Sequence, residues 1–168
     1  MSMTDPMWFA VQTWPRYEKK AARELKNRGV EVFLPLQRSV HQWSDRRHVV
    51  QLPLFPNYVF VRIPGLLDSR VVVLRTTGVI GFVGVRGVGT PVPESEIGAI
   101  RRILEKGIDY ENCPFLRVGQ RVRIRGGSLD GIEGVLVAKN GGQNLLVSIN
   151  IIQRSLSVRL AGYSLEAA

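Results

Sequence analysis

The chain has 168 residues and a formal net charge of +9, from 23 Lys and Arg against 14 Asp and Glu. Hydrophobic residues make up 45% of it, which is enough for a packed core and excludes wholesale disorder. The apolar runs fall well short of the roughly 18 residues that cross a bilayer, and the N-terminus has no secretory signal pattern. A single cysteine, Cys113, excludes a disulfide framework. We therefore expect a cytoplasmic, basic protein of one or two domains, with no membrane contact, whose partner is nucleic acid or another polyanion.

Strand and helix patterns interleave in the first 106 residues. Runs rich in aromatic and β-branched side chains predict strands at residues 7–13, 30–34, 58–63 and 80–85. A basic helix is predicted over residues 16–28, and a second helix begins at Pro93, where Glu94 and Glu96 suit the positive end of the helix dipole. Residues 68–74 fit a short helix or a strand, and their valines weakly favour a strand. The interleaving predicts an α+β domain.

Most of the positive charge lies in this first part. Residues 1–106 hold 16 Lys and Arg against 9 Asp and Glu, a net of +7, whereas residues 107–168 hold 7 against 5, a net of +2. A run of cations is usually a solvated surface, but these cations stand beside Trp14, Tyr17 and Trp43, which are able to stack on bases. Trp43 belongs to the cationic tip of a hairpin predicted over residues 37–51. The predicted nucleic-acid contacts are Arg16, Lys19, Lys20, Arg23, Trp43, Arg46, Arg47 and Arg75.

The chain changes character after residue 106. Residues 107–117 are predicted to be a polar linker, and beyond them no helical period appears. Four or five short strands are separated there by the glycine turns at residues 126–127, 130–131 and 140–142, a pattern typical of a compact β-barrel. The predicted domains are therefore residues 1–106 and residues 118–168, joined by the linker at 107–117.

Two segments carry a resemblance to a known family. Residues 118–124 (VGQRVRI) and 130–136 (DGIEGVL) resemble a KOW motif, in which Gly131 and Gly134 would supply a positive φ or a close backbone approach. Residues 54–61 (LFPNYVFV) are similar to the N-terminal domain of NusG-type transcription elongation factors. Asn57 and residues 150–154 look more like the specialised, RfaH-like paralogues. The resemblance spans residues 8–160 and implies an antiparallel sheet flanked by helices, followed by a small all-β KOW barrel.

The resemblance also implies a function in transcription. A protein of this family would bind the RNA polymerase clamp through its N-terminal domain, suppress pausing and termination, and contact the non-template DNA strand or upstream duplex DNA. The matching docking positions are Phe55, Tyr58, Phe60, Phe82 and Val83. In strand alternation Tyr58 and Phe60 share one face of the strand, and Val59 and Val61 share the other. Only one of these two sets therefore needs to belong to the core.

The KOW domain of such a protein would recruit a second partner, such as a ribosomal protein or the termination factor Rho. The matching recruiting positions are Leu129, Ile132, Ile151 and Arg154, although each aliphatic side chain among them is equally suited to the barrel core. We expect the chain to be a monomer.

No catalytic, cofactor or metal-binding pattern stands out, so no enzyme is indicated. His41 and His48 have neither a cysteine nor an acidic residue at metal-ligand spacing, and Cys113 has no sequence-local base. The alternative to a polymerase factor is a ribosome- or RNA-associated KOW-domain protein with no polymerase role.

Overall fold

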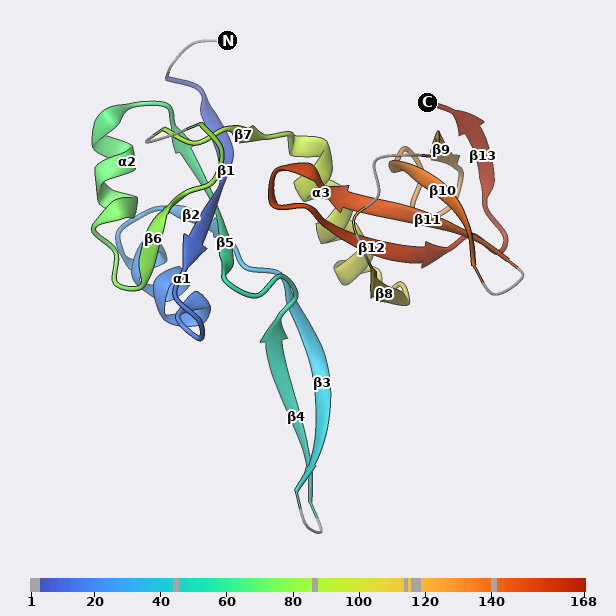
Figure 1. Cartoon of the computed structure of the whole chain (residues 1–168), viewed down its shortest axis with the longest axis horizontal. Coiled ribbons are helices and arrows are strands. Elements are labelled where there is room, and N and C mark those ends of the chain that lie inside the picture. Colours follow the sequence, from blue (N-terminus) through green and yellow to red (C-terminus); the bar gives the residue numbers. More distant parts are fainter. Residues whose placement is uncertain (1–3, 44–45, 86–87, 114, 116–118, 140–141) are drawn as a thin grey trace. The chain divides into compact units, whose positions relative to one another are not determined.

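The computed structural model describes residues 4–43, 46–85, 88–113, 115, 119–139 and 142–168. The chain divides into two compact units, Met1–Pro91 and Val92–Ala168. The first unit combines helices with sheets, and the second is dominated by one sheet (Figure 1). The α+β and all-β characters expected for the two parts are confirmed. Within the described ranges, no helix has the length and apolarity that a membrane span requires.

The first unit is built on an antiparallel sheet in the strand order β2-β5-β1-β6. The strands are β1 (Pro6–Thr13), β2 (Glu31–Phe33), β5 (Tyr58–Pro64) and β6 (Val79–Phe82), and the two-residue strand β7 (Pro91–Val92) marks the junction of the units. Because Phe9 pairs with Val61 and Val11 with Val59, these side chains share one face of the sheet. That face forms the main core of the unit.

Two helices supply the rest of this core (Figure 1). The predicted basic helix is α1 (Glu18–Asn27), which buries Ala22 and Leu25 against the sheet. Residues 67–74 form helix α2 (Leu67–Leu74), so the weak preference for a strand at 68–74 is wrong. Val73 is fully buried in the same cluster, and this packing outweighs the modest cost of β-branched residues in a helix.

The predicted hairpin is present as a separate two-stranded sheet. Strand β3 (Leu36–Trp43) pairs with β4 (Arg46–Pro53), with Val40 opposite Val49 and Trp43 opposite Arg46. Two residues of the expected tip, 44 and 45, lie outside the described residues. Val40 and Val49 are both exposed, so this hairpin carries apolar as well as cationic side chains on its surface.

The second unit pairs one helix, α3 (Glu94–Glu105), with a six-stranded antiparallel sheet in the order β13-β9-β10-β11-β12-β8. The strands are β8 (Tyr110–Cys113), β9 (Gln120–Arg125), β10 (Glu133–Lys139), β11 (Gly142–Ile149), β12 (Arg154–Arg159) and β13 (Ser164–Ala167), with a short 3₁₀ helix, η1 (Asn150–Ile152), before β12.

Two features of this unit differ from the expected domain plan. Helix α3 groups with the C-terminal sheet, although residues 1–106 were expected to form one domain. Part of the expected linker forms β8, because Tyr110–Cys113 pairs with β12. The polar composition of this segment does not indicate a strand. The strand depends on a pairing partner more than 40 residues further along the chain.

The two glycines of the KOW-like segment have the predicted roles. Gly131 has a φ of +85°, and Gly134 lies so close to the carbonyl oxygen of Leu146 that a Cβ atom would overlap it. Val122 and Ile124 on β9 and Val135 on β10 are buried in the interior of this domain, whereas Val137 on β10 is half-buried.

We predict that Gly134→Ala destabilises the second unit by about 2 kcal/mol or more, because the added methyl group meets a backbone atom rather than a flexible side chain. The matched control is Gly98→Ala in α3, where the added Cβ atom would enter open space and alanine favours the helix by about 1 kcal/mol. Denaturant unfolding measures both. A Gly134→Ala variant as stable as the wild type would show that the close approach is not required.

Ion pairs join the strands β9, β10 and β13. Arg123 bonds Glu133, and Arg125 lies 2.5 Å from the carboxylate of Glu166. The hydrogen bond from Arg123 lowers the pKa of Glu133, and the hydrogen bond from Arg125 lowers the pKa of Glu166. A carboxyl group with a lowered folded-state pKa stabilises the fold above its ordinary pKa and loses this contribution as the pH falls through the folded-state pKa.

We therefore predict that Glu133→Gln lowers the melting temperature near neutral pH, and that its difference from the wild type shrinks as the pH falls below 4.5, the ordinary pKa of the carboxyl group. Scanning calorimetry of the full chain across this range measures the difference, and Glu105→Gln at the exposed end of α3 is the control. A difference that stays constant with pH would rule out the ion pairs as its cause.

Candidate interaction surfaces

The second face of the first sheet carries an aromatic cluster. Trp8 meets Phe33 edge-on, and Phe60 lies between Phe33 and Phe55, with ring centroids 6.1 to 6.4 Å apart. Phe60 is 0% exposed and Phe55 is 2% exposed. Two of the predicted docking residues are therefore core side chains in this conformation.

Alternation along β5 predicts that only one face of this strand needs to be buried, but β5 is buried on both faces at Phe60. Val59 and Val61 pack toward the helices, while Phe60 packs into the aromatic cluster. Alternation identifies which side chains share a face, but it leaves open whether the other face is also covered.

The remaining docking positions, Tyr58, Phe82 and Val83, are half-buried. Tyr58 pairs with Gln12 and Phe82 pairs with Val11, so these two aromatics project from opposite faces of the sheet. Phe82 contacts Phe9 at 5.8 Å on the helix side. The structure therefore does not gather the five predicted docking residues into one patch, and among these five Tyr58 is the one that is partly accessible on the side of the aromatic cluster.

A tight turn presents Tyr58. The Tyr58 N–H donates to the Phe55 carbonyl (3.3 Å), and the Asn57 carbonyl accepts from the Thr13 N–H on β1 (2.8 Å). Asn57 has a φ of +73°, which asparagine tolerates better than most residues with a side chain. The local sequence thus fixes Tyr58 at the beginning of β5.

The predicted nucleic-acid residues lie in three places: around α1, on the β3–β4 hairpin and just after α2. Those whose side chains the structure describes are all exposed: Arg16, Lys19, Lys20 and Arg23 in and just before α1, Arg46 and Arg47 on β4, and Arg75 after α2. Trp43 lies on β3, but its side chain is outside the described residues. Within the described part of the chain, no ion pair occupies these cations.

An aromatic pocket lies beside α1, and its aromatic side chains, Trp14 and Tyr17, are predicted to be able to stack on bases but are not among the predicted contact residues. Trp14, Pro15 and Tyr17 line it together with Thr77 and Gly78, and its volume is about 470 Å³. Trp14 is 59% exposed, an unusual position for the largest apolar side chain. The detectable signal in the sequence is an aromatic pair that flanks a proline next to a basic helix.

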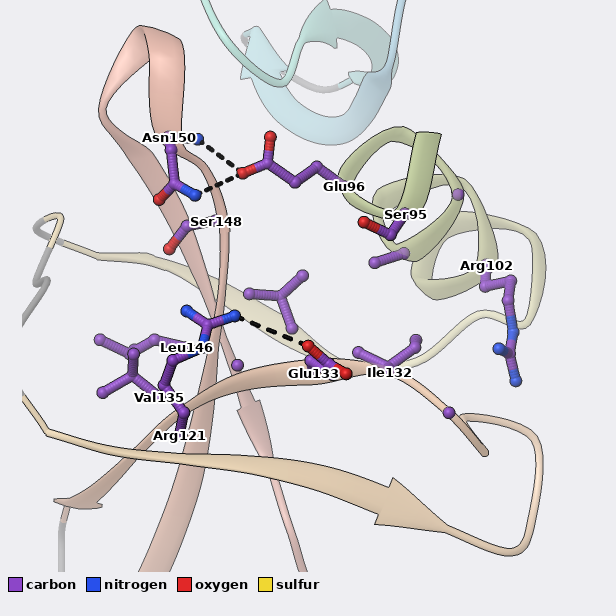
Figure 2. A pocket seen from close by; sticks show the side chains of 15 residues that line it. Ser95, Glu96, Arg102, Arg121, Ile132, Glu133, Val135, Leu146, Ser148 and Asn150 are labelled. Atoms are coloured by element: carbon purple, nitrogen blue, oxygen red, sulfur yellow. Dashed lines mark hydrogen bonds and ion pairs between the residues drawn. The ribbon is translucent and has the colours of Figure 1, made fainter. Parts of the chain in front are cut away.

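In the second unit, a cavity of about 740 Å³ is lined by residues of α3 and of the C-terminal sheet (Figure 2). Its polar end is formed by Glu96, whose Oε1 accepts hydrogen bonds from the backbone N–H (3.1 Å) and the side-chain amide (2.6 Å) of Asn150. Burial raises the pKa of Glu96. Figure 2 also shows Arg121 and Glu133 turned toward each other on the sheet side, 3.8 Å apart.

Helix α3 also holds the loop that carries two of the predicted recruiting residues. The Arg102 guanidinium donates to the carbonyl oxygens of Ser128 (2.6 Å) and Asp130 (2.7 Å), on either side of Leu129. Leu129 is buried, and so is Ile132, which lines the cavity.

The other two recruiting positions are more accessible. Ile151 is half-buried in η1, and Arg154 is exposed at the beginning of β12. The four predicted recruiting residues therefore do not form one exposed surface in this conformation.

No group of three or more His, Cys, Asp or Glu suited to a metal ion occurs among the residues that the structure describes. The described surfaces suited to binding are the exposed cations, the half-buried Tyr58 and the aromatic pocket of the first unit, and the partly covered sheet of the second.

The chain is similar to known proteins over most of its length. The sequence model of the family described as transcription termination factor NusG matches residues 6–101. The transcription termination/antitermination protein NusG of Lactococcus lactis is 29% identical over 177 residues, covering 96% of this chain and 93% of that protein. NusG of Staphylococcus aureus is 33% identical over 136 residues, covering 71% of this chain and 72% of that protein.

The solved structure titled "Domain interaction in Thermotoga maritima NusG" matches with a TM-score of 0.58 at 21% identity, covering 97% of this chain and 98% of that one. This match agrees with the fold of the two units. The resemblance of residues 54–61 to NusG-type factors is confirmed by the match of the family model to residues 6–101. On this match and the relatives named above, the chain belongs to the NusG family of transcription termination and antitermination factors.

Proposed function

We propose that this chain is a transcription elongation and antitermination factor that binds the RNA polymerase clamp through its first unit, suppresses pausing and recruits a second partner through its second unit. Membership of the family supports the general role. The observation that carries clamp binding is Tyr58, a half-buried aromatic that a tight turn holds at the beginning of β5, close in sequence to the buried Phe55 and Phe60. A rigid aromatic residue contributes a large contact area at little cost in side-chain entropy.

We assign the chain to the specialised, RfaH-like branch of the family on the basis of Asn57 and residues 150–154. Housekeeping members of the family typically have glycine at the position of Asn57. Asn57 has a positive φ, a conformation that glycine adopts easily and asparagine is also able to adopt.

The exposed cations are proposed to contact the non-template strand or the upstream duplex. Arg46 and Arg47 stand at the far end of the β3–β4 hairpin, and Arg16, Lys19 and Lys20 lie at the N-terminal end of α1. Contacts with phosphates give affinity without sequence choice, and they act alongside the polymerase contact.

Recruitment of a ribosomal protein or Rho is proposed to begin at Ile151 and Arg154, the accessible pair. Leu129 and Ile132 would take part only after the loop that Arg102 holds is released, because both side chains are buried in this conformation.

We predict that Tyr58→Ala weakens binding to purified core RNA polymerase by about tenfold or more, since it removes the aromatic side chain that we propose contacts the clamp. A pull-down with titrated polymerase measures this loss. Tyr163→Ala, which alters a half-buried tyrosine of the second unit, is the control and is expected to bind as the wild type does.

Equal binding of the wild type and Tyr58→Ala would contradict the assigned docking residue. A wild-type chain that captures ribosomal proteins but no polymerase would favour the alternative role of a ribosome-associated KOW-domain protein.

We also predict that Arg46→Ala with Arg47→Ala weakens binding to DNA with an unpaired bubble and lowers the slope of log affinity against log salt by about 2, one for each lost phosphate contact. Lys106→Ala with Arg159→Ala removes two exposed cations of the second unit and is the control. Fluorescence anisotropy across a salt series measures the slope, and an unchanged slope in the hairpin variant would refute the contact.

A further inference from the structure

The β3–β4 hairpin forms a two-stranded sheet of its own, and Figure 1 shows it extending away from the main sheet of the first unit. It is anchored at its base, where the Leu54 N–H donates to the Pro35 carbonyl (2.8 Å) and both residues are buried. Beyond this base the ribbon has two faces, because side chains alternate along each strand and directly paired residues share a face.

One of these two faces is exposed throughout and is called the open face below. Its six residues form three cross-strand pairs: Arg38 with Gln51, Val40 with Val49, and Gln42 with Arg47. All six side chains are exposed, and the exposed fractions of the two valines are 60% and 55%. The four polar side chains make no hydrogen bond or ion pair with another described residue. Packing within the chain therefore does not account for this face.

The opposite face of the same two strands is partly covered. Its residues Gln37, Ser39 and Val50 are half-buried. Valine side chains in strands normally stabilise a sheet by packing against neighbours, and the valine pair of the open face has no such cover. The open face is therefore the side on which the hairpin has side chains available for a partner.

The residue types of the open face are those that recognise base edges in duplex DNA. Arginine bonds the O6 and N7 atoms of guanine, glutamine bonds the N6 and N7 atoms of adenine, and small apolar groups contact the thymine methyl group. The major groove of B-DNA is wide enough for a two-stranded ribbon. An antiparallel strand rises about 3.4 Å per residue, as successive base pairs do, so Arg38 and Gln42 are separated by roughly four base-pair steps.

The charge of the hairpin is complementary to DNA. Residues 36–53 contain three arginines and a single acidic residue, Asp45. The arginines are distributed over both faces, because Arg38 and Arg47 belong to the open face whereas Arg46 is paired with Trp43 on the opposite one. A ribbon with cations on both faces attracts the phosphates on both sides of a groove.

We propose that the open face of the hairpin enters the major groove of duplex DNA and recognises a short base sequence there. Arg38, Gln42 and Gln51 contact base edges, and the valine pair packs against thymine methyl groups between them. This inference rests on the proposed DNA contact of the first unit. It adds a choice of sequence, which contacts with phosphates alone do not provide.

The test begins with the full chain and a pool of DNA duplexes that contain roughly ten randomised base pairs. Repeated capture of bound duplexes is expected to enrich a shared motif of about four or five base pairs. Fluorescence anisotropy then compares one selected duplex with a scrambled duplex of the same composition. The wild type is expected to bind the selected duplex about tenfold more tightly or better.

Two variants separate recognition of bases from attraction to phosphates. Gln42→Ala with Gln51→Ala is expected to weaken binding to the selected duplex about five- to one-hundred-fold, with unchanged affinity for the scrambled duplex. Arg38→Lys keeps the charge but loses the bidentate contact, so it also loses preference for the selected duplex while the slope of log affinity against log salt is unchanged. Gln143→Ala, which removes an exposed glutamine of β11, is the matched control and is expected to discriminate as the wild type does.

Three results would overturn the proposal. The first is a selection that enriches no shared sequence, and the second is a sequence preference that both hairpin variants retain. The third is equal binding of an RNA duplex with the selected sequence, because the major groove of an A-form helix is too deep and narrow for side chains to reach the bases.

The result is separable from the proposed function. Duplex binding that depends on salt but not on sequence would contradict recognition of bases and leave the phosphate contacts of Arg46 and Arg47 supported. The clamp contact is measured independently by the pull-down with Tyr58→Ala. Both hairpin variants are expected to bind core polymerase as the wild type does.

Discussion

The first unit depends on the burial of β5 on both faces. On one face Val59 and Val61 pack with the helices, and on the other Phe60 packs with Phe33 and Phe55. A central strand enclosed in this way offers no side chain from its middle to a partner. Surfaces for binding must therefore come from the turns and loops at the strand ends. Such positions are occupied by Tyr58, by the pocket that Trp14 and Tyr17 line, and by the β3–β4 hairpin.

Much of this fold was predictable because its signals are local. Aromatic and β-branched runs marked β1 and β5, and the cationic segment between two strand patterns marked the hairpin. The predictions for residues 68–74 and 107–117 were wrong because contacts with residues far along the chain decide the local structure there. Helix α2 contains a run of valines, but the burial of Val73 against the sheet decides its conformation. Strand β8 forms because β12 offers it an edge, which no pattern within residues 110–113 reveals.

The functional surfaces were predicted less completely than the fold. Local composition identified the exposed cations and the resemblance to NusG-type factors identified Tyr58, but whether Phe60 and Leu129 are buried depends on residues far along the chain. Helix α3 gives the clearest example. Its acidic first turn fits the helix dipole, yet Glu96 also accepts two hydrogen bonds from Asn150, which lies 54 residues further on. The family match ends at residue 101, within a helix that groups with the second unit.

We propose that RNA polymerase docks at the beginning of β5 and that nucleic acid binds to the neighbouring loops. In this proposal, hydrophobic contact would provide the attachment, while the exposed cations would orient the nucleic acid. The most direct test of this central claim is the lifetime of purified RNA polymerase at a defined pause site, measured with and without the full chain. We expect the chain to shorten the pause. An unchanged or longer pause at concentrations that saturate the polymerase would contradict it.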